Sequence, residues 1–258
     1  MKLRDKLNME ENYLHIIDWN KNTIKEWYEK IENLQLNEEK GLQIYPRPNI
    51  EVIKATYRSI YGYQMDILRT TYSVGKEMDK VKTEYLMTVK AVTDSGWNFR
   101  NNYTDMIWLL SIGIMLEIED DYFTELVNLV EQSNPKDFLI DFLIHSRIQS
   151  WERKSQKFLW NRPYQFLEQV ISLSQLGENV KAKAKLHEYL QKKWLLGCKD
   201  ESWYITRLDT NSNTNKTHKG YWSFESGALV KILGLDDSDW QDLSYYPYDM
   251  VHYKDSNK

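Results

Sequence analysis

The chain has 258 residues and a mass of 31.0 kDa, which corresponds to one large domain or two small ones. Hydrophobic residues make up 41% and aromatic residues 14%, which excludes a disordered or fibrous protein because such chains lack apolar mass. The 34 Lys and Arg against 38 Asp and Glu give a net charge of -4. This balance argues against a nucleic-acid partner, since phosphate backbones are bound by an excess of Lys and Arg.

The single cysteine, Cys198, excludes an internal disulfide and any metal site built from several thiolates. The segment from Met1 to Glu10 carries charges throughout and has no apolar stretch like that of a signal peptide. The most apolar run, Met106 to Leu116, has about half the length needed to cross a bilayer. The sequence therefore predicts a soluble, cytoplasmic protein with no membrane partner.

The first predicted helix is amphipathic. Its apolar residues between positions 17 and 34 recur at steps of three, four and seven, which places them on one helix face. Gly41 should end this helix, because glycine is favoured just beyond a helix C-terminus. The sequence Tyr45-Pro46-Arg47-Pro48 then predicts an extended connector, since a residue before proline avoids helical backbone angles.

A second helical pattern extends from Ile50 to Val92. Gly62 and Gly75 interrupt it, and each indicates a kink, a break or a close helix crossing. The segment from Asp105 to Leu116 is apolar on nearly every side, which is typical of a fully buried helix. A short amphipathic helix should follow from Asp120 to Val130.

The next helices are predicted from their starting residues. Asn134-Pro135 has the composition of a cap and first turn for a helix through Leu143, and we place a domain boundary here, between residues 1–132 and 133–258. Asn161-Arg162-Pro163 should start another helix in the same way. Further helical patterns run from Val180 to Trp194 and from Phe224 to Leu233. With no stretch of strand-like alternation, the predicted fold is all-α, with two packed helical subdomains and no substantial β-sheet.

No catalytic motif stands out. The five histidines have no neighbours at metal-ligand spacing, and the sparse glycines form no phosphate-binding loop. His145 and Cys198 are better explained as buried structural residues than as a base and a nucleophile. We therefore expect no catalytic residue, no cofactor and no metal. The alternatives are a helical adaptor or, less favoured, a carboxylate-based enzyme in which His145 or Glu225 would be essential.

Charge is distributed unevenly along the chain. No Lys or Arg occurs between Arg100 and Lys136, where seven carboxylates lie, or between Lys231 and Lys254, where five lie. The rest of the chain therefore carries +8, and the two acidic stretches could form a negative surface that attracts a basic partner. An equally weighted explanation is that Asp120 and the residues near Asp237 only cap the starts of helices.

The C-terminal half contains a distinctive series of motifs, Gly220-Tyr221-Trp222-Ser223-Phe224-Glu225, Ala228, Lys231-Ile232-Leu233-Gly234-Leu235-Asp236-Asp237 and Tyr245-Tyr246-Pro247-Tyr248-Asp249. With these motifs it closely resembles the C-terminal domain of the PoNi immunity proteins. The first half is similar to the matching N-terminal domain in Arg4-Asp5, in Tyr72-Ser73-Val74-Gly75 followed by Tyr85, and in Leu109-Leu110-Ser111-Ile112-Gly113-Ile114. We expect the large aromatic residues of these motifs to pack a core, and Tyr245-Tyr246-Pro247 to hold the C-terminal tail.

The resemblance implies a function that composition and spacing do not. Members of that family are helical bacterial proteins encoded beside PoNe-type DNase toxins, which serve in competition between bacteria. This chain would then bind and block a cognate DNase toxin domain. Because a DNase presents positive charge to DNA, the acidic stretches become the candidate contact surface. The candidate residues are Glu117, Glu119, Asp120, Asp121, Glu125, Asp236, Asp237, Asp239, Asp242 and Asp249.

Overall fold

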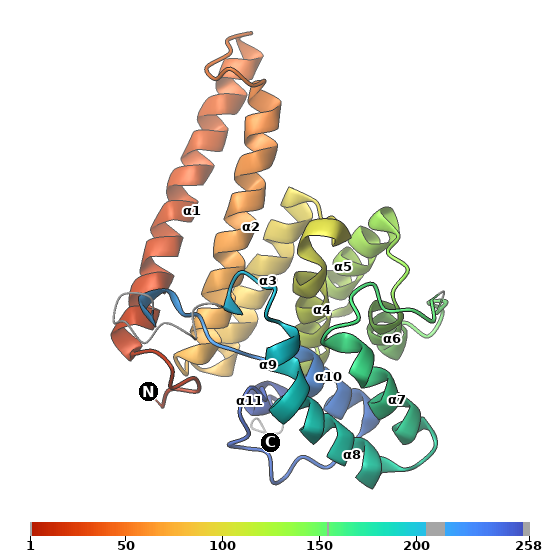
Figure 1. The fold of residues 1–258 in the computed structure, drawn as a ribbon. Coiled ribbons are helices and arrows are strands. Elements are labelled where there is room, and N and C mark those ends of the chain that lie inside the picture. The colour runs from red at the N-terminus through yellow and green to blue at the C-terminus, as the bar shows by residue number, and fades with distance from the viewer. Residues whose placement is uncertain (1, 154, 205–214, 255–258) are drawn as a thin grey trace. The chain divides into compact units, whose positions relative to one another are not determined.

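The computed structural model describes residues 2–153, 155–204 and 215–254 (Figure 1). Over these residues the chain is helical and contains no strand, which confirms the all-α prediction. The chain divides into two compact units. Unit 1 comprises Met1–Trp97 and Thr210–Gly220, and unit 2 comprises Asn98–Asp209 and Tyr221–Lys258. These units group the chain differently from the domains predicted above, whose boundary at residues 132 and 133 stays a prediction.

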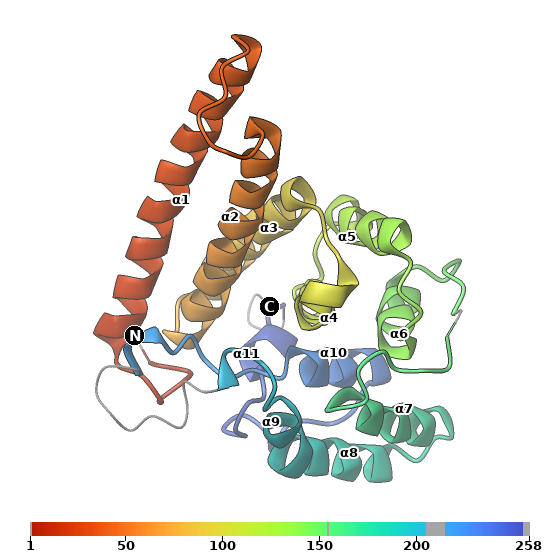
Figure 2. The same ribbon diagram turned by 45° about the horizontal axis from the view of Figure 1, so that its top comes forward.

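Unit 1 is built on three helices, α1 (Glu10–Glu39), α2 (Asn49–Ser73) and α3 (Met78–Ser95) (Figures 1 and 2). Helix α2 packs against both of the others. The predicted long pattern from Ile50 to Val92 is therefore two helices. Gly75 lies in the turn between them, with φ at +86°, whereas Gly62 lies inside α2.

A polar contact joins the three helices of unit 1. The Glu84 side chain of α3 is 8% exposed. One of its carboxylate oxygens accepts from Lys21 of α1 at 2.7 Å, and the other accepts from Gln64 of α2 at 2.9 Å. Because both oxygens are satisfied, this carboxylate can stay buried among the helices.

The N-terminal segment closes the end of α2. Two carbonyl oxygens there, those of Tyr72 and Lys76, accept hydrogen bonds from the Arg4 guanidinium at 3.0 and 2.8 Å. The Ser73 carbonyl accepts from the backbone N–H groups of Arg4 and Asp5. A cation that donates to the free carbonyls at a helix C-terminus also interacts favourably with the negative end of the helix dipole.

The segment from 215 to 220 returns to unit 1 and packs beside this N-terminal segment. His218 is 2% exposed, and its Nε2 lies 3.1 Å from the Asp5 carboxylate. Asn8 donates to the His218 carbonyl at 3.1 Å, and Arg69 of α2 donates to the Gly220 carbonyl at 3.0 Å. Residues more than 140 positions apart in the sequence are thus joined in one buried polar cluster.

Unit 2 surrounds two buried helices, α4 (Phe99–Met115) and α10 (Phe224–Leu233), which pack against each other. Every residue from Met106 to Met115 is buried, which confirms the expectation of a helix enclosed on all sides. Gly227 of α10 permits close packing, because a Cβ there would lie 2.4 Å from the Met115 sulfur. The other helices of unit 2 are α5 (Asp120–Ser133), α6 (Phe138–Arg147), α7 (Leu167–Gln175), α8 (Asn179–Glu188), α9 (Trp194–Gly197) and α11 (Tyr248–Val251).

The predicted role of Asn134-Pro135 was wrong. Asn134 ends α5 in the left-handed conformation, with φ at +46°, a conformation that Asn tolerates better than most residues. Helix α6 is capped instead by Asp137, whose side chain accepts from the Ile140 N–H at 2.9 Å. Asp137 also accepts from the Tyr103 hydroxyl at 2.7 Å.

The later predicted helices differ in their details. After Asn161-Arg162-Pro163 the chain first forms a short 3-10 turn, Tyr164–Phe166, and then continues as α7. The pattern from Val180 to Trp194 is interrupted by a π-helical turn, Tyr189–Lys193, between α8 and α9. Helix α10 has the predicted bounds.

The turn at Gly75 generates a test of unit 1. We expect Gly75→Ala to destabilise the protein by about 2 kcal/mol, because the side chain would occupy a left-handed position and its Cβ would lie 2.1 Å from the Lys2 carbonyl oxygen. Gly62→Ala is the matched control, since nothing lies within 4 Å of its Cβ and alanine favours a helix interior by about 0.5–1 kcal/mol. Urea unfolding measures both. Equal midpoints for the two variants would contradict the close packing at Gly75.

Candidate partner-binding surface

The ten predicted contact residues all belong to unit 2. Glu117, the first of them, follows the C-terminus of α4 in a left-handed conformation with φ at +46°. Its carboxylate binds the amines of Lys231, at 2.8 Å, and Lys254. These two hydrogen-bonded amines hold the pKa of Glu117 at about 2. Lys231 and Lys254, which flank the second acidic stretch in the sequence, thus bind a carboxylate of the first acidic stretch.

Asp120 begins α5, where the positive end of the helix dipole favours a carboxylate. It also forms an ion pair with Arg147 of α6. The Arg147 guanidinium lies 4.5 Å from the centre of the Phe123 ring, so this arginine is held by packing as well as by charge. The Asp120 side chain nevertheless remains 93% exposed. It can therefore face a partner while it lies at the positive end of its own helix.

Lys183 of α8 neutralises part of the second acidic stretch. Its amine lies 3.7 Å from the Asp236 carboxylate and 2.5 Å from that of Asp239. The side chains of the two aspartates are 74% and 67% exposed. Asp236 accepts from the Ser238 N–H at 3.1 Å, and hydrogen bonds from the Ser238 side chain and from this N–H lower the pKa of Asp236. This segment is a turn, so the expectation that it starts a helix was wrong.

Asp237 faces the interior of unit 2. It is 6% exposed, and its carboxylate accepts from the Tyr246 hydroxyl and lies 3.0 Å from His252 Nε2. A carboxylate in this position supports the C-terminal segment and presents little surface to a partner. We therefore leave Asp237 out of the proposed contact set.

The remaining candidates are more accessible. Asp121 and Asp242 are exposed, and neither has an ion-pair partner in the part of the chain that the structure describes. Glu119 is exposed, whereas Glu125 and Asp249 are half-buried, and all three take part in other interactions.

The two units differ in charge. Unit 1 has 17 Lys and Arg against 15 Asp and Glu, and unit 2 has 17 against 23. Their net charges are therefore +2 and -6. The acidic character of the chain lies in unit 2, although Lys183, Lys231, Lys254 and Arg147 offset part of each acidic stretch.

Glu225, considered above as an enzymatic carboxylate, is completely buried in α10. One of its oxygens accepts from the Ser223 hydroxyl at 2.7 Å and from the Tyr189 hydroxyl at 2.9 Å. No Lys or Arg pairs with it within the described ranges, and burial raises its pKa to about 7. In this position Glu225 does not contact solvent. His145 is also held internally, with Nδ1 2.9 Å from the Trp151 carbonyl oxygen.

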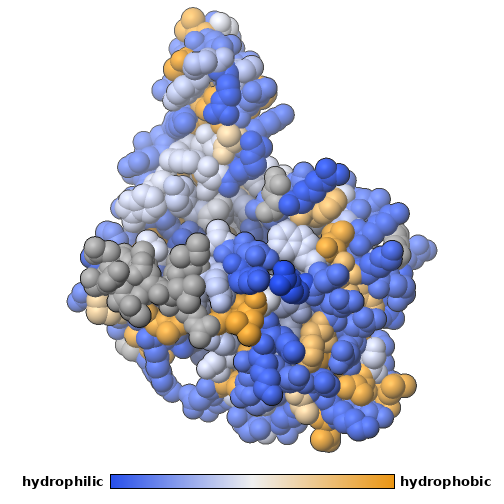
Figure 3. Space-filling view, in the orientation of Figure 1, coloured by the Kyte–Doolittle hydropathy of each residue, from blue (hydrophilic) through white to orange (hydrophobic). Residues whose placement is uncertain are grey.

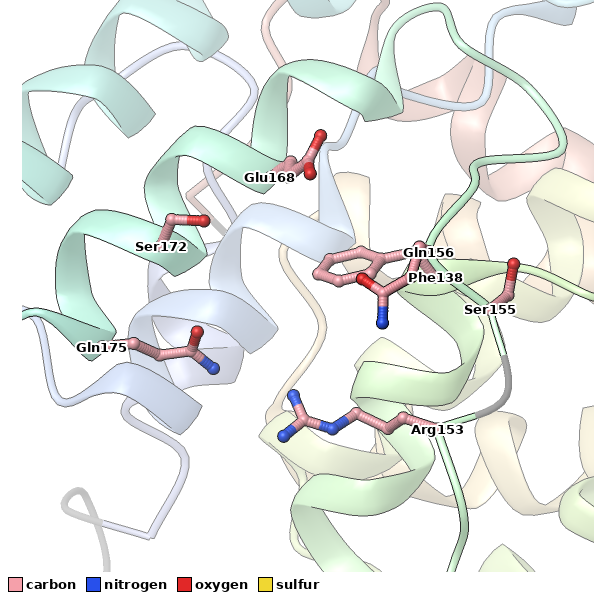
Figure 4. Close-up of a pocket in the computed structure, with 7 residues that line it drawn as sticks. All are labelled: Phe138, Arg153, Ser155, Gln156, Glu168, Ser172 and Gln175. Carbon is pink, nitrogen blue, oxygen red and sulfur yellow. The ribbon is translucent and has the colours of Figure 1, made fainter.

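A pocket of about 410 Å³ lies between α7 and the segment that follows α6 (Figure 4). Its lining residues are Phe138, Arg153, Ser155, Gln156, Glu168, Ser172 and Gln175. Small-molecule sites are walled mainly by apolar side chains, and this lining is mainly polar. The pocket therefore supports no ligand assignment. Among the described residues, no group of three or more His, Cys, Asp or Glu side chains is placed to hold a metal ion, and no helix there is long and apolar enough to span a membrane.

Two family models match the chain. The N-terminal model of the PoNe immunity protein (PoNi) matches residues 4–128, and the C-terminal model matches residues 135–250. The chain belongs to the PoNi family. No curated protein matches it. Among solved structures, protein PA2201 from Pseudomonas aeruginosa matches with a TM-score of 0.64 and 17% identity, covering 100% of this chain and 99% of its own, which shows a shared fold.

The motifs that carry the PoNi resemblance are structural. Tyr221, Trp222 and Phe224 are at most 7% exposed, which confirms that they pack a core. The Tyr245 carbonyl accepts from the Ser223 N–H at 2.8 Å, so the C-terminal segment is held against the start of α10 as expected. In unit 1, the two segments that carry the N-terminal resemblance, at Arg4 and at Gly75, lie together at the end of α2. The residues that carry the family resemblance thus include many that maintain the fold.

Glu225 generates a pH prediction for this PoNi protein. Its folded pKa of about 7 lies above its usual value of 4.5, so the folded state holds its proton more tightly than the unfolded state does. The resulting stability is complete below pH 4.5 and is lost as pH rises through 7, a change of up to about 3 kcal/mol. We expect Glu225→Gln to remove this loss, because the Gln oxygen can still accept from Ser223 and Tyr189.

The measurement is urea unfolding at several pH values from 5 to 8. Glu117→Gln is the control, because the pKa of Glu117 is lowered and its contribution is lost only as pH falls from about 4.5 toward 2. This control should keep the wild-type slope between pH 5 and 8. If Glu225→Gln also kept that slope, the account of a buried, proton-holding carboxyl would be wrong.

Proposed function

We propose that this immunity protein neutralises a cognate DNase toxin in the cytoplasm by covering the toxin's basic, DNA-binding face with carboxylates of unit 2. Family membership supports a toxin as the partner. A DNase has to bring positive charge to the phosphates of DNA. A surface of opposite charge that occupies that face would exclude DNA without any chemical step, and so the proposal requires no catalytic residue.

The observation that carries this proposal is the charge of unit 2, -6 against +2 for unit 1. The exposed carboxylates of unit 2 form two groups, those without and those with an ion-pair partner among the described residues. Asp121 and Asp242 lack an ion-pair partner among the described residues and can bind a basic side chain directly. Asp120, Asp236 and Asp239 are paired, but each side chain is at least 67% exposed.

Exposed ion pairs contribute little to stability, on the order of 0–1 kcal/mol. An arginine or lysine of the toxin can therefore share or replace the internal partner at small cost. The long-range effect of such a surface is mainly on the association rate, which electrostatic attraction can raise by orders of magnitude at low salt. The proposed contact set is thus Asp120, Asp121, Asp236, Asp239 and Asp242.

The test uses the toxin domain encoded beside this gene. We expect Asp121→Lys combined with Asp242→Lys to slow association about tenfold or more at low ionic strength and to weaken its dependence on salt. Stopped-flow or biosensor kinetics measure the rate. These two residues are chosen because their replacement breaks no ion pair within the described part of the chain.

The matched control is Glu26→Lys combined with Glu29→Lys, which makes the same change in net charge on exposed positions of α1 in unit 1. This control should reduce the rate much less. Equal slowing by both variants would mean that only net charge matters, and an unchanged rate for the unit 2 variant would refute the acidic contact surface.

A further inference from the structure

A cluster of apolar side chains is exposed at the end of the α1–α2 hairpin in unit 1. We call this cluster the hairpin tip, and its members are Leu36, Leu42, Ile44, Tyr45 and Ile50. Each is between 40% and 56% exposed. Figure 3 shows hydrophobic residues gathered at the upper end of the hairpin. Single exposed apolar residues are common in proteins, but five within fifteen positions mark an interaction surface.

The exposure follows from the lengths of the helices. Helix α3 has 18 residues and packs on α2, which has 25, so the first turns of α2 extend beyond the cover of α3. Among the helices that the structure describes, α1 and α2 pack against each other at that end without cover from α3. Ile31, Leu34 and Val52 are buried between them, and the hairpin tip is left outside.

The connecting loop holds the hairpin tip in a defined conformation. The Asn49 side chain donates to the Leu42 carbonyl at 2.8 Å and accepts from the Ile44 N–H at 3.4 Å. Pro46 and Pro48 restrict the backbone further. The Lys30 amine lies 5.2 Å from the centre of the Tyr45 ring. A surface ordered before binding loses less entropy when a partner docks.

The charges beside the hairpin tip are balanced and unpaired. Glu38 and Glu39 lie in the last turn of α1, which has no basic residue, so they sit at the negative end of the helix dipole. Lys40 and Arg47 lie in the adjoining loop. All four side chains are exposed, and none forms an ion pair with another described residue. The carboxylates of Glu38 and Glu39 therefore have no ion-pair partner among the described residues.

We propose that the hairpin tip is a self-association surface, which binds the hairpin tip of a second copy of this chain across a two-fold axis. In such a pair the apolar side chains pack together, and Lys40 and Arg47 of one copy meet Glu38 and Glu39 of the other. Two-fold pairing requires a patch that complements itself, and two positive beside two negative charges meet that requirement. A strongly basic partner would instead encounter Lys40 and Arg47.

The size of the surface predicts a weak dimer. Residues of this size have areas on the order of 200 Å², so five half-exposed residues offer roughly 500 Å² per copy. A pair would bury about 1,000 Å² in total, which is near the lower limit for specific interfaces. We therefore expect a concentration-dependent equilibrium, with the mass in sedimentation rising from that of one chain toward that of two.

Charge reversal provides the sharpest test. Glu38→Arg with Glu39→Arg makes the patch wholly positive, and Lys40→Glu with Arg47→Glu makes it wholly negative. Each double variant alone should associate at least about tenfold more weakly than the wild type, because like charges face each other. An equimolar mixture of the two should restore association, since opposite patches then meet. A mixture that stays monomeric while the wild type dimerises would overturn the proposed pairing.

The apolar part is tested by Leu42→Ser with Ile44→Ser, which should abolish association in sedimentation while the unfolding midpoint changes little. The control is Leu176→Ser with Val180→Ser, which replaces side chains that are 75% and 85% exposed in unit 2 and should leave association unchanged. A wild-type protein that remains monomeric at several hundred micromolar would refute self-association. Loss of toxin binding in the Leu42 and Ile44 variant of such a monomer would assign the hairpin tip to the toxin instead.

Discussion

The structure of unit 2 depends on the burial of two helices, α4 from Met106 to Met115 and α10 from Phe224 to Val230. These parts of the two helices are buried on every side, so the other helices of the unit must enclose them. Contacts with α5, α6, α7 and α11 do this. Gly227 lets α10 approach α4 and the C-terminal segment at a distance that any side chain would prevent. The family motifs are concentrated at these contacts because they maintain this packing.

Two carboxylates inside this core accept hydrogen bonds from neutral hydroxyls. Glu225 receives hydrogen bonds from Ser223 and Tyr189, and Asp137 receives one from Tyr103. Cations are used nearer the surface, where Lys231 donates to the Met115 carbonyl at the end of α4 and also binds Glu117. The internal carboxylates therefore serve the fold.

The fold was largely predictable from the sequence because helical spacing is a local property. The bounds of α10 and the burial of α4 could be derived in this way. The cap of α6 could not, because Asn134 and Asp137 are both good cap residues and only the backbone conformation decides between them. At Gly75, but not at Gly62, a Cβ would meet the backbone of Lys2, more than 70 positions away, and such a contact cannot be read from local spacing.

The candidate surface was less predictable, for the same physical reason. A stretch that contains no Lys or Arg in the sequence can still have them nearby in the folded chain, as Lys183 and Lys254 show. The burial of Asp237 also depends on partners brought by the C-terminal segment. The boundary predicted from the sequence divided the acidic residues between two domains, whereas the structure has all ten in unit 2 and shows which of them reach solvent.

The central claim is that this PoNi protein blocks a DNase. The most direct measurement is plasmid cleavage by the C-terminal domain of the protein that the neighbouring gene encodes, with and without an equimolar amount of this protein. The account predicts rapid cleavage by the toxin domain alone and none when the two proteins are mixed before DNA is added. Cleavage that continues at full rate in the presence of an excess of folded immunity protein would contradict it.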